Sequence, residues 1–419
     1  MIMRILWTLP YLPWPTTSGG KTRQYHLLRN LAARGHRITL LVQSKTALDE
    51  EARAALEPWL ERLIVLPRRP LRTAKTLLAV AFAAPPMLAS INGYAPRLQQ
   101  VFKTLLTQEW DVIQIEHSYA FQPFEKPLQQ AGKPFLLTEH NVESALGAAS
   151  YDRLPRWAKL FTVYDQWRYR RWEHRIFAQA SELIAVTEDD AKNLARLSSK
   201  ATSVVVNGVD SDYYAKVQPD PYSRRLLFIG NYEYGPNIDA VQWALDEILP
   251  HVWQAAPTLR FTICGYALPE SWRDRWPDPR IDWQGFVPNL RELQGTAAVF
   301  FAPLRHGGGS KLKVLEAMAA GLAVVTTGQG TSGLQVINGE HYLGSEDPIE
   351  LARLLCEIVD QPQRLRSIGE AGRAYVRAKH DWSVAAAQLE RIYTRFSPQD
   401  PPRLPPQEPS QEQGTRVCV

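Results

Sequence analysis

The chain has 419 residues, enough for two domains of ordinary size. Its composition, 45% hydrophobic and 22% charged, is that of a folded globular protein and excludes a largely disordered chain. The net charge of +5 is too small to indicate a protein that binds nucleic acid.

Short apolar runs alternate with helical periods along the chain. Runs that are apolar on both faces and separated by helices indicate parallel sheets with right-handed crossovers. Twelve strands are predicted, too many for one such sheet here, so we predict an α/β fold with two Rossmann-like doubly wound domains that face each other across a cleft. The predicted strands are residues 4–9, 38–42, 63–66, 112–115, 135–138, 183–186, 203–206, 225–229, 260–264, 281–283, 299–302 and 322–326.

The boundary between the two domains is expected in the polar segment 216–224, which carries two prolines. We expect the first domain over residues 1–215 and the second over residues 222–378. Residues 379–396 read as a final helix with one apolar face, and the Pro/Gln-rich residues 397–419 as a disordered tail.

The first strand leads into a loop with two adjacent glycines, Gly19 and Gly20. The run Ser-Gly-Gly-Lys-Thr imitates the end of a P-loop, but Pro15 replaces the glycine that a P-loop needs five residues before Gly20. The loop is expected to open a helix over residues 22–34 and to let a ligand approach the backbone closely. A tight strand-to-helix turn is the structural alternative.

Titratable side chains follow two successive strands. Glu116 and His117 end one strand, and Glu139, His140 and Asn141 end the next. Side chains at the carboxyl ends of parallel strands point into the crevice where ligands bind, so we predict a functional site here. No metal-ligand spacing is present, and we expect hydrogen bonding rather than a metal centre.

In the second half, two strands end in Gly230 and Gly265, and a third is followed by Phe286 and Val287. We expect these loops to line the other side of the cleft. Phe286 and Val287 are placed to pack against a nucleobase.

Residues 300–327 carry the most specific pattern in the chain. Three glycines, Gly309 the last of them, run into a helix predicted to open at Ser310. Free amides of a glycine loop and of a helix N-terminus bind anions, and Lys311 and Lys313 add positive charge. Glu316 follows them. Amides, lysines and a carboxylate together suit a nucleotide diphosphate, with the carboxylate on the ribose hydroxyls.

Cysteine usage and apolar runs bear on the cellular location. The three cysteines have neither metal nor disulfide spacing, which is typical of a cytoplasmic protein. The apolar run 77–89 is too short to span a bilayer; packing on its own domain is the first interpretation, and peripheral contact with the inner face of a membrane is the second. Tryptophans among arginines at 157–172 also suit a membrane surface or a polyanion, but favour an ordinary amphipathic helix.

Several motifs together resemble family 4 of the retaining glycosyltransferases. They are SGGxxR near the start, VVNGVD at 205–210, FIG at 228–230, ICG at 263–265, GFVPNL at 285–290 and GGGSKLKVLEAMAAGLAVVTT at 307–327. The resemblance implies the GT-B fold, a nucleotide-sugar donor held mainly by the second domain, no metal or other cofactor, and a last helix that crosses back to the first domain.

The resemblance also implies roles for individual residues. Glu316 would bind the donor ribose, and the amides of Ser310, Lys311 and Leu312 its phosphates. Gly19 and Gly20 would lie against the sugar diphosphate. His117 would stand near the reacting sugar, with Glu116 open as an alternative by one residue of register, and His140 and Asn141 would lie on the acceptor side.

The sequence departs from the family pattern at two places. Gly308 stands where the family often has a second glutamate, and the loop 231–236 lacks the Arg and Lys that commonly bind phosphate. Lys311, Lys313 and Arg305 are the substitutes that we propose for the missing cations.

The predicted activity is transfer of a hexose from a nucleotide diphosphate sugar to a glycan or lipid-linked acceptor, in polysaccharide or glycoconjugate synthesis. A nucleotide-sugar epimerase of the same fold and a non-catalytic nucleotide-sugar-binding protein are the alternatives.

Overall fold

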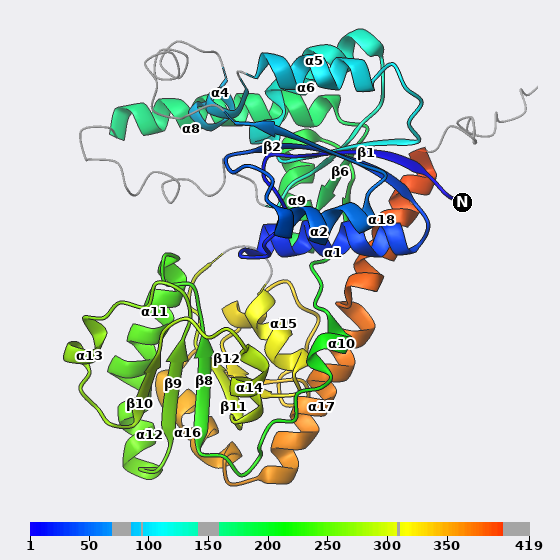
Figure 1. The fold of residues 1–419 in the computed structure, drawn as a ribbon. Helices are drawn as coiled ribbons and strands as arrows, with labels where there is room; N and C mark the ends of the chain where they lie inside the picture. The colour runs from blue at the N-terminus through cyan, green and yellow to red at the C-terminus, as the bar shows by residue number, and fades with distance from the viewer. Residues whose placement is uncertain (69–84, 94, 141–158, 308–310, 397–419) are drawn as a thin grey trace, which may run out of the picture.

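The computed structural model describes residues 1–68, 85–93, 95–140, 159–307 and 311–396. Two domains, each built on one sheet, follow each other along the chain (Figure 1). Several predicted features lie outside the described residues: Asn141, Gly308, Gly309, Ser310, Trp157, the run 77–84 and the tail 397–419.

The first domain is a seven-stranded sheet in the order β3-β2-β1-β4-β5-β6-β7, with every pair parallel. Its strands are β1 (Arg4–Leu9), β2 (Arg37–Ser44), β3 (Arg62–Pro67), β4 (Val112–Glu116), β5 (Leu136–Thr138), β6 (Glu182–Ala185) and β7 (Thr202–Val204). Its helices are α1 (Gly19–Ala33), α2 (Glu50–Leu56), α4 (Met87–Gly93), α5 (Pro96–Leu105), α6 (Gln122–Ala131), α8 (Lys159–Gln179) and α9 (Glu188–Ser198).

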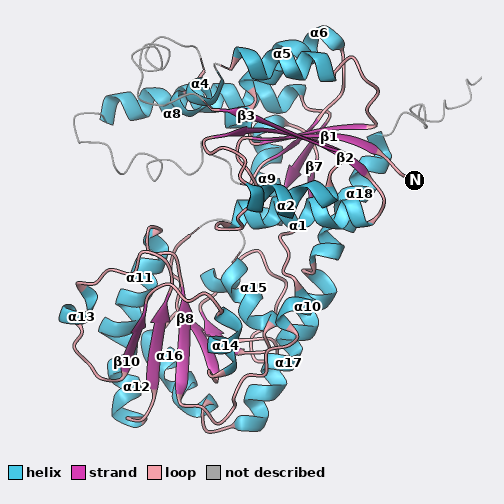
Figure 2. Cartoon of the chain, viewed as in Figure 1, coloured by secondary structure: helices cyan, strands magenta, loops and turns pink. Residues whose placement is uncertain are grey.

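The second domain is a six-stranded parallel sheet in the order β10-β9-β8-β11-β12-β13. Its strands are β8 (Arg225–Ile229), β9 (Arg260–Cys264), β10 (Ile281–Gln284), β11 (Val299–Ala302), β12 (Ala323–Thr326) and β13 (Leu343–Gly344). Its helices are α11 (Gly235–Trp243), α12 (Leu249–Ala255), α13 (Trp272–Arg275), α14 (Leu290–Gly295), α15 (Leu312–Ala319), α16 (Pro348–Ile358) and α17 (Pro362–Lys379). Short α10 (Ser211–Tyr214) lies between the sheets in sequence. This is the predicted fold class, and helices flank both sheets (Figure 2).

Successive side chains of a strand point to opposite faces of the sheet. The core of the first domain therefore consists of two clusters, one on each face of its sheet. Leu6 belongs to the cluster covered by α4, α5, α6, α8 and α9, whereas Ile5 and Trp7 belong to the cluster covered by α1. The last helix, α18 (Trp382–Phe396), also packs in this second cluster, through Leu389 and its neighbours. A helix from the end of the chain therefore completes the core of the first domain, beside α1 (Figure 1).

Two segments of the chain connect the domains, one at Val209 and one at Asp381, and backbone hydrogen bonds join them. The Val209 N–H donates to the His380 carbonyl at 2.7 Å, and the Trp382 N–H donates to the Val209 carbonyl at 3.3 Å. The neighbouring Asn207 accepts a 2.7 Å hydrogen bond at Oδ1 from the buried guanidinium of Arg23, in α1. The connection is thus a short parallel bridge tied to the helix that carries the glycine pair.

The structure differs from the predicted elements at several places. Helix α15 begins at Leu312 rather than at Ser310, and α18 begins at Trp382 rather than at residue 379. Helix α1 begins at Gly19 rather than at residue 22, because Ser18 caps it and accepts a hydrogen bond from the Lys21 N–H. Strand β13 was not predicted, since two residues leave no periodic signal. Within the described ranges, no helix is both long and apolar enough to span a bilayer.

Candidate active site

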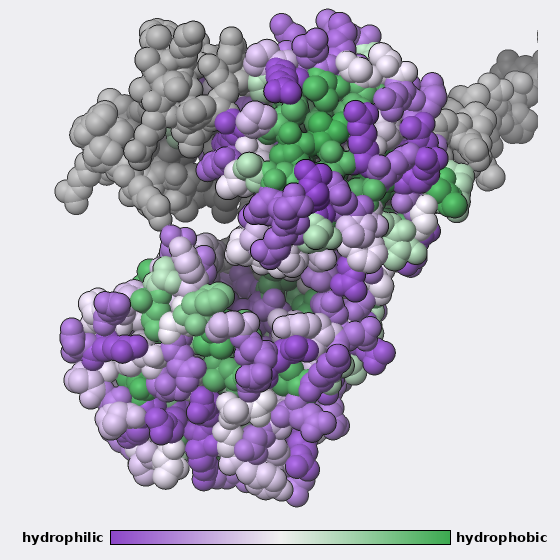
Figure 3. Space-filling model, in the orientation of Figure 1, coloured by the Kyte–Doolittle hydropathy of each residue, from purple (hydrophilic) through white to green (hydrophobic). Residues whose placement is uncertain are grey.

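The first wall of the site is the N-terminal end of α1. A β-carbon at Gly19 would lie 2.9 Å from Leu312 Cδ1, which belongs to the second domain. A β-carbon at Gly20 would lie 2.9 Å from Tyr11 Oη. Real β-carbons avoid such distances, so a larger residue at either position would require the end of the Leu312 or Tyr11 side chain to shift. Figure 3 shows the molecular surface hollowed between the two domains.

Strand β4 ends at Glu116, whose carboxylate is buried beneath amide side chains. Gln24 Nε2, from α1, donates to Glu116 Oε2 at 2.7 Å, and Gln114 Nε2 donates to Oε1 at 2.5 Å. His140 Nε2 lies 3.3 Å from the same Oε2. Burial raises the pKa of Glu116, and neighbouring donors and His117 partly oppose this effect. Both carboxylate oxygens are therefore occupied within the protein.

His117 follows β4 with a backbone φ of 67°, a conformation that non-glycine residues adopt only when their surroundings hold them there. Its Nε2 lies 3.1 Å from Tyr11 Oη, and its ring centroid is 4.4 Å from that of His140. Burial lowers the pKa of both histidines to about 3, so both imidazoles are neutral near pH 7.

Three of the residues predicted at these strand ends are thus gathered at one point: Glu116, His117 and His140. Glu139 has a structural role, because its carboxylate accepts a hydrogen bond from the Ser118 backbone N–H.

The ends of β8, β9 and β10 carry further predicted site residues of the second domain. Gly265 has a φ of 137°, and a β-carbon there would lie 1.7 Å from the Gly230 carbonyl oxygen, so the close approach of the two loops requires glycine. Phe286, just after β10, is 75% exposed, and Val287 beside it is partly buried. An exposed phenyl ring at a strand end is available for stacking.

Lys311 and Lys313 stand at the start of α15. Lys311 Nζ donates to the Gly307 carbonyl at 2.6 Å, while Lys313 Nζ donates to Asn237 Oδ1 and lies 4.7 Å from the centroid of the Phe228 ring. Burial lowers the pKa of Lys311 to about 8 and that of Lys313 to about 7. Desolvated ammonium groups gain more than exposed ones from an anionic ligand.

Lys313 extends to the loop 231–236, which lacks the phosphate-binding Arg and Lys of the family pattern. Asn237 is in the first turn of α11, and its Nδ2 donates to the Asn231 carbonyl of the preceding loop at 2.7 Å. The ammonium group of Lys313 therefore lies beside the loop 231–236 although it comes from another helix.

Glu316 lies one turn beyond Leu312 on α15. Burial raises the pKa of Glu316 to about 7, and both Lys313 and a hydrogen bond with Tyr214 oppose the rise. Tyr214 comes from α10, which directly follows the first passage between the domains. The carboxyl group is thus held by a residue of the connection.

Arg305 is already engaged. Its Nε and its terminal nitrogen Nη2 donate to the two carboxylate oxygens of Asp239 at 3.1 and 2.6 Å, and its guanidinium lies 4.9 Å from the Trp243 ring centroid. A phosphate at Arg305 would have to compete with this bidentate ion pair. Of the three proposed substitutes, the two lysines are the better placed.

The domains also meet around the start of α9. Asp190 lies close enough to Lys311 to raise the lysine pKa partly back towards its usual value. A β-carbon at Gly333, after β12, would lie 3.2 Å from Thr187 Cγ2. The lysine end of α15 and the acidic first turn of α9 therefore face each other across the cleft.

Several residues of this network were missed from the sequence. No sequence motif marks Gln24 or Tyr11 as site residues, because their role depends on neighbours from β4 and β5. Gln114 did carry one, because a glutamine inside a buried strand needs partners. It finds one in Tyr393 of α18, whose hydroxyl donates to Gln114 Oε1.

Comparison with known proteins agrees with the fold and the motifs. Residues 18–209 match the glycosyl transferase 4-like domain, and residues 223–361 match the glycosyl transferases group 1. A glycogen synthase of Mycobacterium tuberculosis is 25% identical over 424 residues, covering 96% of this chain and 97% of that protein. A phosphatidyl-myo-inositol mannosyltransferase of the same organism is 30% identical over 204 residues, covering 45% of this chain and 53% of that protein.

Among solved structures, Anabaena Alr3699/HepE in complex with UDP and glucose superposes with a TM-score of 0.65 at 15% identity, over 94% of this chain and 99% of that one. The superposition extends through both domains and shows that the two proteins share the same fold. The two matched regions together cover both domains, and the chain belongs to the group 1 glycosyltransferases of the GT-B fold.

Proposed function

We propose that this glycosyltransferase moves a hexose from a nucleotide diphosphate sugar to a glycan or lipid-linked acceptor, with retention of the anomeric configuration. The observation that supports the proposal is the start of α15, where buried Lys311 and the partly buried Lys313 and Glu316 lie opposite the glycine pair of α1. The named relatives that transfer mannose, and the UDP bound to the Anabaena protein, support a nucleotide sugar as the donor.

The donor is proposed to lie with its diphosphate between α15 and Gly19. Lys311 and Lys313 contact the phosphates, Glu316 accepts hydrogen bonds from the ribose, and Phe286 packs against the base. Lys313 stands in for the missing cations of loop 231–236, since it already reaches Asn237 beside that loop.

His117 is the residue proposed to touch the transferred sugar. Glu116 is the weaker alternative, because Gln24 and Gln114 already occupy its two oxygens. A neutral imidazole can donate one hydrogen bond and accept another, which suits sugar hydroxyls. The acceptor is proposed to approach past His140.

The two ammonium groups supply the proposed catalysis. As the bond between the sugar and the diphosphate stretches, negative charge gathers on the departing phosphate oxygens. Fixed cations at that position stabilise the transition state more than the ground state, so the mechanism that we propose needs no metal. Removing one such group costs about 3 kcal/mol of barrier, or roughly a hundredfold in rate.

The donor can be identified by thermal shift with UDP-, GDP- and ADP-sugars, because a ligand that binds the native state raises the melting temperature. Activity is then measured as release of the nucleoside diphosphate in the presence of an acceptor. Lys311→Ala should lower turnover roughly a hundredfold, while Lys103→Ala, which removes an exposed lysine of α5, should leave it unchanged.

Equal turnover in the two variants would refute the assignment of Lys311. Conversion of the donor without acceptor would instead indicate an epimerase. Donor binding without release of nucleoside diphosphate, across a panel of acceptors, would indicate a non-catalytic binding protein.

A further inference from the structure

Helix α8 carries aromatic and basic side chains on its outward face. Tyr164 and Trp167 are each 52% exposed. The acidic residues of the helix, Asp165 and Glu173, are fully buried on the opposite side. We call the outward set the α8 stripe; it consists of Val163, Tyr164, Trp167, Arg170, Arg171 and His174.

The arginines of α8 fall into two groups. Arg168 is buried against Asp165 at 3.6 Å, and Arg175 pairs with Glu125 at 3.1 Å. Arg170 and Arg171 have no carboxylate within ion-pair distance in the part of the chain that the structure describes, and Arg171 only lies 4.9 Å from the Trp167 ring centroid. Among the described residues, the two guanidinium groups of the stripe therefore have no carboxylate partner.

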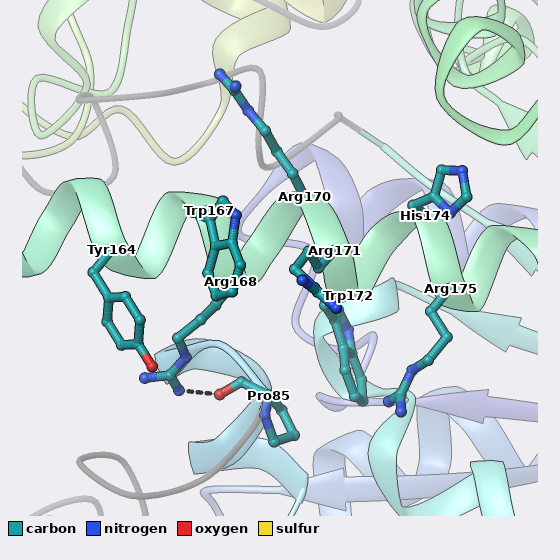
Figure 4. A pocket seen from close by; sticks show the side chains of 9 residues that line it. All are labelled: Pro85, Tyr164, Trp167, Arg168, Arg170, Arg171, Trp172, His174 and Arg175. Carbon is teal, nitrogen blue, oxygen red and sulfur yellow. Dashed lines mark hydrogen bonds between the residues drawn. The ribbon is translucent and has the colours of Figure 1, made fainter.

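Except for Val163, the side chains of the α8 stripe line a hollow of about 940 Å³ along α8, next to Pro85 (Figure 4). That volume is within the range of small-molecule sites. In Figure 4, Tyr164, Arg168 and Trp172 extend from the helix on the side of Pro85, whereas Arg170 extends in the opposite direction. The hollow is thus bordered by rings and by guanidinium groups within a short length of one helix.

This combination matches a defined chemistry. The flat C–H face of a sugar ring packs on an indole or phenol ring, and a guanidinium group binds phosphate through paired hydrogen bonds. The Arg171 guanidinium lies 4.9 Å from the centroid of the Trp167 ring, so one ligand with a sugar ring and an attached phosphate can contact both groups.

We propose that the α8 stripe is a subsite for the acceptor, and that this acceptor is a saccharide carrying a phosphate. The inference rests on the proposed function, since it places the acceptor on the first domain, where α8 lies. A soluble sugar phosphate and a lipid-linked one share this chemistry. A flat bilayer is the less suitable occupant, because the stripe borders a hollow.

Binding to the full chain is measured by calorimetry with two probes, α-glucose 1-phosphate and glucose phosphate esterified to a short prenyl chain. Arg170→Ala/Arg171→Ala should weaken binding at least about tenfold. Arg37→Ala/Arg53→Ala is the matched control, because it removes two exposed arginines that pair with carboxylates on the same domain, and it should change nothing. Trp167→Ala should weaken both probes, with Trp167→Phe closer to wild type.

Binding of both probes would indicate that the sugar phosphate alone is recognised. Binding of only the prenyl probe would indicate a lipid-linked acceptor. Either outcome supports the proposal. Equal affinity in wild type and in Arg170→Ala/Arg171→Ala overturns it. It is also overturned if neither probe binds, including the case where vesicles of phosphatidylcholine and phosphatidylglycerol alone capture the protein. Binding of UDP-glucose and GDP-mannose, measured on the same samples, tests the proposed function separately.

Discussion

Replacing Lys313 by Met would remove the ammonium group and keep an unbranched apolar chain over the Phe228 ring. In the ligand-free protein, burial holds the pKa of Lys313 at about 7, with Glu316 raising it and Lys311 lowering it. A diphosphate binds the protonated lysine and raises its pKa, so binding takes up a proton wherever the free lysine is neutral.

The expected size of the pH effect on donor affinity follows from the pKa of Lys313. The lysine contribution to donor affinity is complete below pH 7, since Lys313 is already charged there. Above pH 7 it falls about tenfold per pH unit, or about 1.4 kcal/mol, until the pKa of the bound lysine is reached. Below pH 7 the loss in Lys313→Met is that of one charged hydrogen bond, about 1.5–3 kcal/mol.

The assay is calorimetric titration with the nucleoside diphosphate from about pH 6 to about pH 9, on wild type, Lys313→Met and the control Lys103→Met. Lys311 and Glu316 also titrate in this range, but they are present in all three proteins. Lys313→Met also removes the charge that opposes the rise in the Glu316 pKa, so the difference between the profiles reports Lys313 together with its coupling to Glu316. Parallel profiles for wild type and Lys313→Met would refute the reasoning.

Two further substitutions test the framework of the site. Gly265→Ala should cost about 2–4 kcal/mol of unfolding free energy in urea, because its β-carbon would lie 1.7 Å from the Gly230 carbonyl oxygen. Gly285→Ala, where nothing lies within 4 Å of a β-carbon, is the control, and equal stability of the two would contradict this account. Tyr393→Phe should cost about 1 kcal/mol through loss of the bond from α18 to the buried Gln114, and an unchanged urea midpoint would show that this bond is not stabilising.

Much of the architecture could be predicted because it depends on local pattern. Strands buried on both faces, separated by helices, are sufficient to indicate two parallel sheets. Glu116, His117 and His140 could be placed together in advance, since the carboxyl ends of parallel strands share one edge. Lys313 and Glu316 were identified by their position after a glycine loop.

What could not be predicted depends on contacts between distant segments. Arg305 has the right charge at the right place in the sequence, yet Asp239 of α11 neutralises it. Tyr393 reaches Gln114 across 279 positions of sequence, a contact with no local signature. Glu139, like Glu116, precedes a histidine at the end of a strand, but its carboxylate accepts a hydrogen bond from the Ser118 backbone N–H at the turn after β4.

The paired crossing of the chain at Val209 and His380 has a mechanical consequence. Because the two crossings are hydrogen-bonded side by side, we expect a rotation of one domain against the other to be centred on them and to change the width of the cleft without stretching either crossing. Sliding of one domain past the other would break those bonds. Arg23, anchored on Asn207 beside the two crossings, would transmit such a rotation to α1 and so to the glycine pair. Substrate exchange can then proceed with both cores intact.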